Sequence, residues 1–299
     1  MTIKKLETKK IKWIDLVNPT DKEIEEIMEK YNFHELDREA VVEENQRARV
    51  DTYEDYLFVV MHFPKFDMKN KRYFNNEFNV FISKKFLITI RWYTASSIEK
   101  IFESYKNKDK GEINTGYILY DMIDAMLDKS FKLLDKSDRD VREIESSIFG
   151  HSRKKETISD IMIKKRNIIT LKHMLEPQIP VFKILELRMN TMFKDEVEVY
   201  FENLIDKLEK IVSEIVIIQE NVESVEDTLK SLFDLQTNNS VRYLTIFSAF
   251  MLPLTLITGF FGMNLELGLF NHYAVFGIFT GTTIVMLLIF IWLIKKNKL

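Results

Sequence analysis

The sequence contains no cysteine and few glycines and prolines, 8 and 5 among its 299 residues. Without cysteine there is no disulfide framework, no thiolate zinc site and no cysteine nucleophile. The low glycine and proline content argues against a disordered or low-complexity chain. A formal net charge of −3 without a basic stripe disfavours nucleic-acid binding. The first ten residues also lack the apolar core that a cleaved signal peptide needs.

Recognisable catalytic constellations are missing as well. The five histidines show no metal-ligand spacing, and the sequence carries neither a nucleophile–base set nor a phosphate-binding loop. We therefore expect no organic cofactor, and an enzyme is the least favoured class of function.

Charged side chains are also missing from one part of the chain. After Arg242, the only Asp, Glu, Lys or Arg before residue 295 is Glu266, so all but one of the 46 acidic residues precede this part. Residues 244–263 and 273–294 form two uncharged runs within it. A helix needs about 20 apolar residues to cross the bilayer core, so both runs predict membrane spans. A buried helical hairpin in a soluble core is the less favoured alternative.

The charges around the two runs predict their orientation. Arg242 precedes the first run and the tail 295–299 is basic, whereas the connection 265–272 carries only an acid. Because cytoplasmic flanks carry the excess of Lys and Arg, we expect both termini in the cytoplasm and the connection outside. The chain is thus predicted to be a multi-pass protein of the plasma or inner membrane.

The first run carries a polar stripe. Steps of three and four residues connect mostly small or hydroxylated positions on one helix face: Thr245, Ser248, Leu252, Thr255 and Gly259. Such residues also permit close helix packing, which on its own is the commoner explanation. The second run is mostly apolar and is predicted to face lipid. Two helices are too few to enclose a path, so a pore would need several chains.

A heptad pattern precedes the first run. Its apolar residues alternate in steps of three and four: Phe201, Leu204, Leu208, Ile211, Ile215, Ile218, Val222, Val225, Leu229 and Leu232. This spacing predicts helix pairing, and we expect the stalk at 191–242 to supply the oligomer contact. Because the register continues into the first run, stalk and span are predicted to form one helix, on the order of 100 Å long.

The N-terminal region, residues 1–110, is predicted to be a compact α/β unit. Strand-like patterns cover 11–17, 56–63, 74–83 and 86–92. Thr20 and Glu23 offer a capping box for a helix through Tyr31. Residues 111–190 are expected to pack on this unit as long helices, with patterns over 115–149 and 156–188. Their dense charge is usually a solvated face, and a cation-responsive surface is the alternative.

A motif at the end of the first run identifies a family. Residues 261–264 read Phe-Gly-Met-Asn and follow Met-Leu-Pro-Leu-Thr at 251–255. Together with the short connection, the second run and the basic tail, this pattern resembles the CorA family of magnesium transporters. The resemblance extends through Glu176-Pro177 and Tyr200-Phe201 and covers essentially the whole chain.

The resemblance implies a CorA-like homopentameric funnel. Each chain would have an α/β N-terminal cytoplasmic domain, a long α-helical stalk, a pore-lining first transmembrane helix at 243–264 and a second one at 273–294. The expected partners are other copies of the chain, the lipid bilayer and hydrated divalent cations, without nucleic acid. The selectivity filter would consist of Gly262, Met263 and Asn264. The pore-lining positions implied are Asn238, Val241, Leu244, Ser248, Leu252, Thr255 and Gly259.

The chemistry of these residues suits Mg²⁺ as the transported ion. Mg²⁺ prefers oxygen partners and loses its water reluctantly. A ring of neutral Asn264 carbonyls can hydrogen-bond the hydration shell, whereas a carboxylate ring would release the ion slowly. Glu266 would concentrate cations at the external mouth, and Leu244 and Leu252 would close the pore by dewetting. The membrane potential would drive passive uptake, at roughly 4.6 kcal/mol per 100 mV for a doubly charged ion.

Regulation in the family is attributed to cytoplasmic Mg²⁺ held by acids. The sequence has Asn203 where relatives carry an acid, so either Glu202 or Asp206 would substitute as regulatory metal ligands or the sensor would be weaker. Co²⁺ and Ni²⁺ are further ions for the same pore. A Zn²⁺ transporter of the same superfamily is an alternative, against which Met263 argues. A membrane-anchored sensor or scaffold without transport is another, and the polar stripe argues against it.

Overall fold

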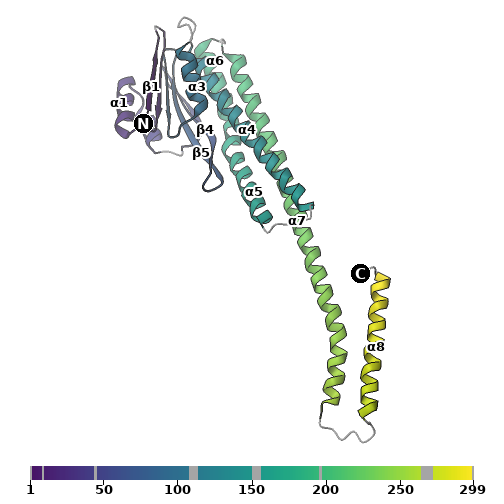
Figure 1. Ribbon diagram of the computed structural model, residues 1–299. Helices are drawn as coiled ribbons and strands as arrows, with labels where there is room; N and C mark the ends of the chain where they lie inside the picture. The colour runs from purple at the N-terminus through teal and green to yellow at the C-terminus, as the bar shows by residue number, and fades with distance from the viewer. Residues whose placement is uncertain are drawn as a thin grey trace. The chain divides into compact units, whose positions relative to one another are not determined.

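The computed structural model describes residues 2–8, 10–43, 46–107, 114–149, 156–194, 197–263 and 272–297. The chain divides into two compact units, Met1–Asp227 and Thr228–Leu299. The first holds a sheet with helices and the second is helical (Figure 1). This confirms the α/β N-terminal domain followed by a long helix, and the finer domain boundaries stay predictions.

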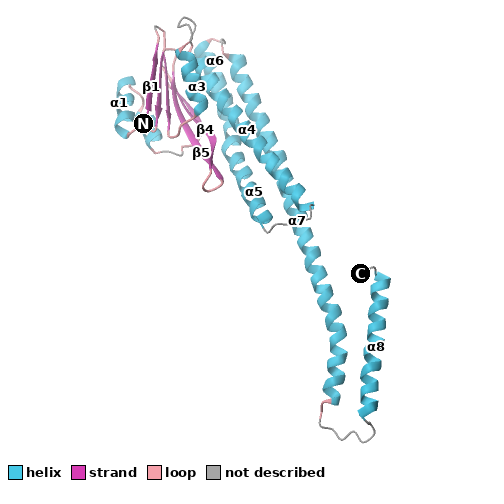
Figure 2. Cartoon of the chain, viewed as in Figure 1, coloured by secondary structure: helices cyan, strands magenta, loops and turns pink. Residues whose placement is uncertain are grey.

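One six-stranded sheet forms the centre of the first unit (Figure 2). Its order is β1-β2-β6-β5-β4-β3, and all neighbours are antiparallel except β2 and β6. The strands are β1 (Thr2–Glu7), β2 (Lys12–Val17), β3 (Arg49–Thr52), β4 (Leu57–Asp67), β5 (Arg72–Ile82) and β6 (Phe86–Arg91). The long β4–β5 hairpin pairs in register from Leu57 with Ile82 to Asp67 with Arg72.

Two short helices cover one face of the sheet. Helix α1 (Asp21–Tyr31) begins at the expected capping box, where the Thr20 N–H donates to the Glu23 carboxylate at 2.8 Å. With α2 (Glu35–Val42) it packs on alternate apolar residues of the central strands. The resulting core includes Ile14, Leu16, Ile24, Met28, Val41, Phe58, Val60, Phe81, Ile88 and Ile90. This core fixes the register of β2, β4, β5 and β6, because a slip by one residue would expose it.

The opposite face packs against α3 (Ser96–Lys106) and α4 (Thr115–Phe149), and Figure 1 shows them across the sheet from α1. Trp13 of β2 contacts Phe102 of α3, with ring centroids 4.8 Å apart. Beside it, Arg91 and Asp15 form an ion pair of 2.8 Å, and both side chains are fully buried. Arg91 also donates from Nε to the same carboxylate at 3.1 Å, so the pair is bidentate and well satisfied.

Four helical segments complete the first unit. The helix expected over 156–188 is interrupted at Pro177, giving α5 (Glu156–Leu175), the 3₁₀ turn η1 (Glu176–Gln178) and α6 (Ile179–Phe193). Pro177 lacks the N–H that a continuous helix would use, and it suits the start of a new one. Helix α7 (Glu198–Phe261) follows and runs without interruption from the first unit into the second.

The heptad seam of α7 packs inside its own chain. Its residues from Phe201 to Val225 are at most 5% exposed, and α7 is tied to the three preceding helices by lysine–carboxylate pairs. We expected this seam to contact other chains, and the structure corrects that expectation. A heptad pattern reports that a helix is paired, but its partners here are α4, α5 and α6.

The second unit consists of the remainder of α7 and of α8 (His272–Asn297). Among the described residues, α7 is the one helix long and apolar enough to cross a membrane. Helix α8 contributes a shorter apolar stretch, Tyr273–Met286. Large apolar side chains of both helices are exposed, including Leu252, Leu256, Phe276 and Ile284. Such surface suits a membrane or other chains rather than water.

Candidate ion-conduction pathway

One continuous helix carries every predicted pore-lining residue. Asn238, Val241, Leu244, Ser248, Leu252, Thr255 and Gly259 all lie on α7. Their spacing by three and four residues brings them to one side of the helix. Val241, Leu244 and Leu252 are 55%, 64% and 68% exposed. A Cβ added at Gly259 would meet nothing within 4 Å. Within the described part of the chain, this side of α7 is therefore left largely uncovered.

The threonine hydroxyls on this part of α7 already use their protons. Thr245 donates to the Val241 carbonyl at 2.9 Å, and Thr255 donates to the Met251 carbonyl at 2.9 Å. Hydroxyls that donate back to their own helix are satisfied without a partner helix. The hydroxyl oxygen keeps acceptor lone pairs, so Thr255 can offer oxygen to a hydrated cation.

Helix α7 ends at the predicted filter motif. The Gly262 N–H donates to the Thr258 carbonyl at 2.9 Å, and a Cβ built on Gly262 would lie 3.0 Å from that carbonyl oxygen. The close approach explains why glycine suits this position. Met263 is 57% exposed. Asn264 and Glu266 lie outside the described residues, so their roles at the mouth stay predictions.

The two predicted regulatory acids lie on the outer side of the stalk. Glu202 and Asp206 are exposed and one helical turn apart on α7. In the described part of the chain, no group of three or more His, Cys, Asp or Glu is arranged to hold a metal ion. A single chain thus brings these two carboxylates near each other, and any further ligand would come from elsewhere. Asn203, between them, donates its amide to the Tyr120 hydroxyl of α4 at 3.2 Å.

A lysine that the sequence analysis did not single out lies one turn along α7. The Lys207 ammonium donates to Asp124 at 2.5 Å and to Asp128 at 2.8 Å, both on α4. Burial lowers the pKa of Lys207, but the hydrogen bonds to the two carboxylates outweigh burial and leave the pKa above its ordinary value. No sequence signal marks this contact, because Lys207 lies about 80 residues after the two aspartates in the chain.

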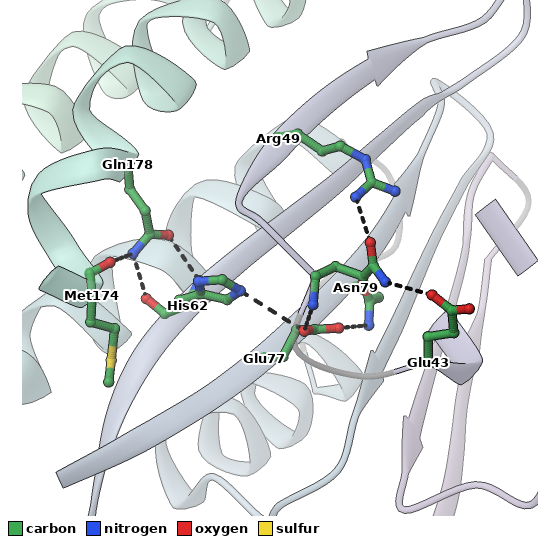
Figure 3. Close-up of polar contacts among 8 residues, drawn as sticks. Glu43, Arg49, His62, Glu77, Asn79, Met174 and Gln178 are labelled. Carbon is green, nitrogen blue, oxygen red and sulfur yellow. Dashed lines mark hydrogen bonds and ion pairs between the residues drawn. The ribbon is translucent and has the colours of Figure 1, made fainter. Parts of the chain in front are cut away.

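A second polar cluster joins the sheet to the helices (Figure 3). His62 of β4 lies beside Glu77 of β5, with 3.9 Å between Nε2 and Oε2. The Glu77 carboxylate also accepts the Gln46 N–H at 2.8 Å and the Asn79 amide at 2.9 Å. Burial holds the pKa of His62 below its ordinary value, although a hydrogen bond with the Gln46 backbone acts in the opposite direction. The cluster positions the segment after α2 against β4 and β5.

Comparisons with known proteins agree with this architecture. The Methanocaldococcus jannaschii structure titled as the complete structure of CorA magnesium transporter superposes with a TM-score of 0.81 at 20% identity. It covers 96% of this chain and 90% of its own. The full-length CmaX structure gives a TM-score of 0.78 at 16% identity, covering 95% of this chain and 88% of its own. Both likenesses concern the fold.

Sequence relatives carry metal-transport names. The putative metal ion transporter YfjQ of Bacillus subtilis is 28% identical over 95% of this chain and 89% of its own. The cobalt/magnesium transport protein CorA of Thermotoga maritima is 25% identical over 85% of this chain and 73% of its own. The zinc transport protein ZntB of Photorhabdus laumondii is 23% identical over 74% of this chain and 67% of its own.

The match to a family covers nearly the whole sequence. Residues 8–296 match the family described as CorA-like Mg²⁺ transporter protein. This family consists of membrane transporters rather than enzymes. With a CorA fold, a long apolar helix and the Gly-Met-Asn motif at its end, the chain belongs to the CorA-like Mg²⁺ transporter family and is a divalent metal ion transporter of that family.

Proposed function

We propose that the protein is a Mg²⁺ channel that admits the ion passively, driven by the membrane potential. The uncovered polar side of α7 is the observation that carries this proposal. A mere membrane anchor has no use for a stripe of Ser248, Thr255 and Gly259 that its own chain leaves open. Since one stripe cannot enclose a path, five chains would each contribute one α7 around a common axis.

The filter would be the ring of Gly262, Met263 and Asn264 at the outer end of α7. Neutral amide and carbonyl oxygens of the five Asn264 residues would hydrogen-bond the hydration shell of Mg²⁺, which is costly to remove. Glu266 would raise the local cation concentration at the entrance. Asn238 would receive the ion near the inner end, and Leu244 and Leu252 would be apolar constrictions that stop conduction when they dewet.

The gate would respond to cytoplasmic Mg²⁺ through the stalk. Both termini would be cytoplasmic, and α8 would be the second span on the lipid side of α7. Glu202 and Asp206 are free to bind a hydrated divalent ion because the chain leaves both on the exposed side of α7. Ions bound there between neighbouring chains would hold the assembly closed, and their loss at low Mg²⁺ would release it.

Flux measurement in liposomes tests the filter. We expect Asn264→Ala to lose potential-driven Mg²⁺ uptake while the protein still assembles as a pentamer. Asn107→Ala, at the exposed end of α3, is the matched control and should transport like the wild type. Full uptake by Asn264→Ala would remove the assignment of the filter. Absence of uptake by the wild type under any internal Mg²⁺ concentration would instead favour a non-transporting sensor.

Zinc transport is the second candidate, because zinc transport proteins occur among the relatives. The same liposomes decide between the two ions. With external Mg²⁺ and Zn²⁺ in competition, the Mg²⁺ proposal expects Mg²⁺ influx to persist and Zn²⁺ to act as a weak competitor. Co²⁺ and Ni²⁺ are expected to enter as well. Preferential Zn²⁺ influx would reverse the assignment.

A further inference from the structure

The contact between α4 and α7 contains a cation supplied by the chain itself. Lys207 of α7 reaches between two carboxylates of α4, Asp124 and Asp128, and donates to both. The two acids are one helical turn apart, where like charges repel each other. Their side chains are 26% and 55% exposed, and that of Lys207 is 27% exposed. One ammonium therefore links two partly buried carboxylates to the facing helix.

Lys207 supplies the positive charge that balances Asp124 and Asp128, since the neighbouring side chains engage other partners. One turn before it on α7, Asn203 meets Tyr120 through a neutral hydrogen bond. One turn earlier on α4, Asp121 accepts the Tyr105 hydroxyl of α3 at 2.6 Å, so it faces another partner. Lys210 lies over the Phe131 ring, 5.5 Å from its centroid. Two neighbouring carboxylates that face a second helix are also oxygen ligands of the kind that a divalent cation binds.

We propose that Lys207 is a built-in cation that closes the α4–α7 contact in place of a dissolved divalent ion. The inference deepens the proposed function, because it states which stalk contact does not respond to Mg²⁺. The tethered ammonium cannot dissociate, so α4 stays attached to α7 at every Mg²⁺ concentration. Regulation by Mg²⁺ must then act on carboxylates without a lysine partner, such as Glu202 and Asp206, and α4 moves together with the stalk.

Removing the lysine should convert the contact into a Mg²⁺-dependent one. In Lys207→Met, Asp124 and Asp128 lose their counterion and repel each other, so the contact should loosen. Mg²⁺ can then bind both carboxylates and remove their repulsion, which should restore part of the contact. Lys183→Met is the matched control, because Lys183 pairs α6 to α7 through the single carboxylate of Glu209, at 2.8 Å. One exposed carboxylate holds Mg²⁺ poorly, so this variant should gain no Mg²⁺ response.

Hydrogen exchange of the full-length protein in detergent, with and without millimolar Mg²⁺, measures the effect on peptides of α4. We expect Lys207→Met to exchange about two- to fivefold faster than the wild type without Mg²⁺, as for a lost partly exposed ion pair. Added Mg²⁺ should bring the rate back toward the wild-type value. The triple variant with Asp124→Asn and Asp128→Asn has no charge to bind Mg²⁺ and should lose that response.

The readout does not depend on transport, so it separates this inference from the proposed function. Protection of α4 in Lys207→Met that rises with Mg²⁺ no more than in the wild type would overturn the inference, whatever the flux. The variant with only Asp124→Asn and Asp128→Asn keeps Lys207 and serves as a second test. It should exchange faster than the wild type at α4 with no recovery in Mg²⁺, and recovery there would equally contradict the assignment. A flux defect without these changes would bear on the channel alone.

Discussion

The side-chain amide of Gln178 replaces a β-strand neighbour for His62. Its Oε1 accepts the His62 N–H and its Nε2 donates to the His62 carbonyl, both at 2.8 Å. Strand β3 is short and pairs with β4 only from Leu57 to Val60, so among the described residues no strand neighbours the edge of β4 beyond it. Unpaired backbone groups at a strand edge cost free energy when buried and promote aggregation when exposed. The Gln178 amide satisfies these groups at His62 and thereby anchors the α5–α6 junction to β4.

Replacing this amide should destabilise the first unit. We expect Gln178→Leu to lower the free energy of unfolding by about 1–3 kcal/mol, because two backbone groups of His62 are left without partners. Urea unfolding of the detergent-solubilised protein, followed by circular dichroism, measures the loss. Gln219→Ala removes a side-chain contact on α7 and is expected to cost far less. Equal losses for the two variants would show that Gln178 is not a special anchor.

The buried pair of Asp15 and Arg91 makes a stronger prediction. Arg91→Met leaves the Asp15 carboxylate buried without its counterion, and we expect a loss of about 3–5 kcal/mol. Adding Asp15→Leu to that variant removes the stranded charge and should recover much of the loss. Arg38→Met, which breaks an exposed pair with Glu25, should cost at most about 1 kcal/mol. Thermal unfolding of the four proteins provides the comparison.

His62 should make the first unit less stable at acidic pH. Burial lowers its pKa below the ordinary 6.5, even though Glu77 lies 3.9 Å away. Between pH 6.5 and the lower pKa of the folded state, the unfolded chain binds a proton that the folded chain resists. Stability from this residue is therefore complete above pH 6.5 and falls as the pH drops through that window.

Unfolding midpoints between neutral and mildly acidic pH test this dependence. His62→Gln should reduce the dependence of the unfolding midpoint on pH in that range. His173→Gln, at an exposed position on α5, should leave this dependence unchanged. A wild-type slope that survives in His62→Gln would assign the pH response to other groups.

The lack of cysteine makes the proposed pore side of α7 directly testable. In liposomes, Thr255→Cys should react with a charged thiol reagent added from the aqueous side and lose Mg²⁺ flux. Leu254→Cys, one residue earlier and turned about 100° around the helix, should be protected by lipid or protein. Equal block of both variants would contradict an aqueous pathway along this side of α7.

Much of the fold was predictable because local patterns determine it. The capping box of Thr20 and Glu23, the helix at Thr115–Phe149 and strands β4 to β6 all follow from short-range sequence signals. Strands β1 and β3 were missed. Strand β1 carries Lys4 and Lys5 at the edge of the sheet, where its partner β2 rather than its composition makes it a strand. Pro177 was visible in the sequence, but a proline is also tolerated in the first turn of a helix, so it did not by itself predict the interruption.

The candidate pathway was predictable along one helix and no further. The stripe from Thr245 to Gly259 needs only the helical period. The partners of the heptad seam and the bridge from Lys207 to α4 depend on which helices pack together, and spacing along one helix carries no such information. Long-range contacts of this kind become visible only when the tertiary arrangement is known.

The internal burial of the heptad seam has a consequence for biosynthesis. Every seam residue up to Val225 finds its partners among residues that the ribosome has already produced, since α4, α5 and α6 all precede α7. The core of the first unit therefore needs no residue of the second unit, in keeping with N-terminal domains folding first. Past Asp227, large apolar side chains of α7 are exposed, and we expect lipid and other copies of the chain to cover them. Assembly should thus be a late event that joins units already folded, and a variant that damages the apolar part of α7 or α8 should leave the first unit folded.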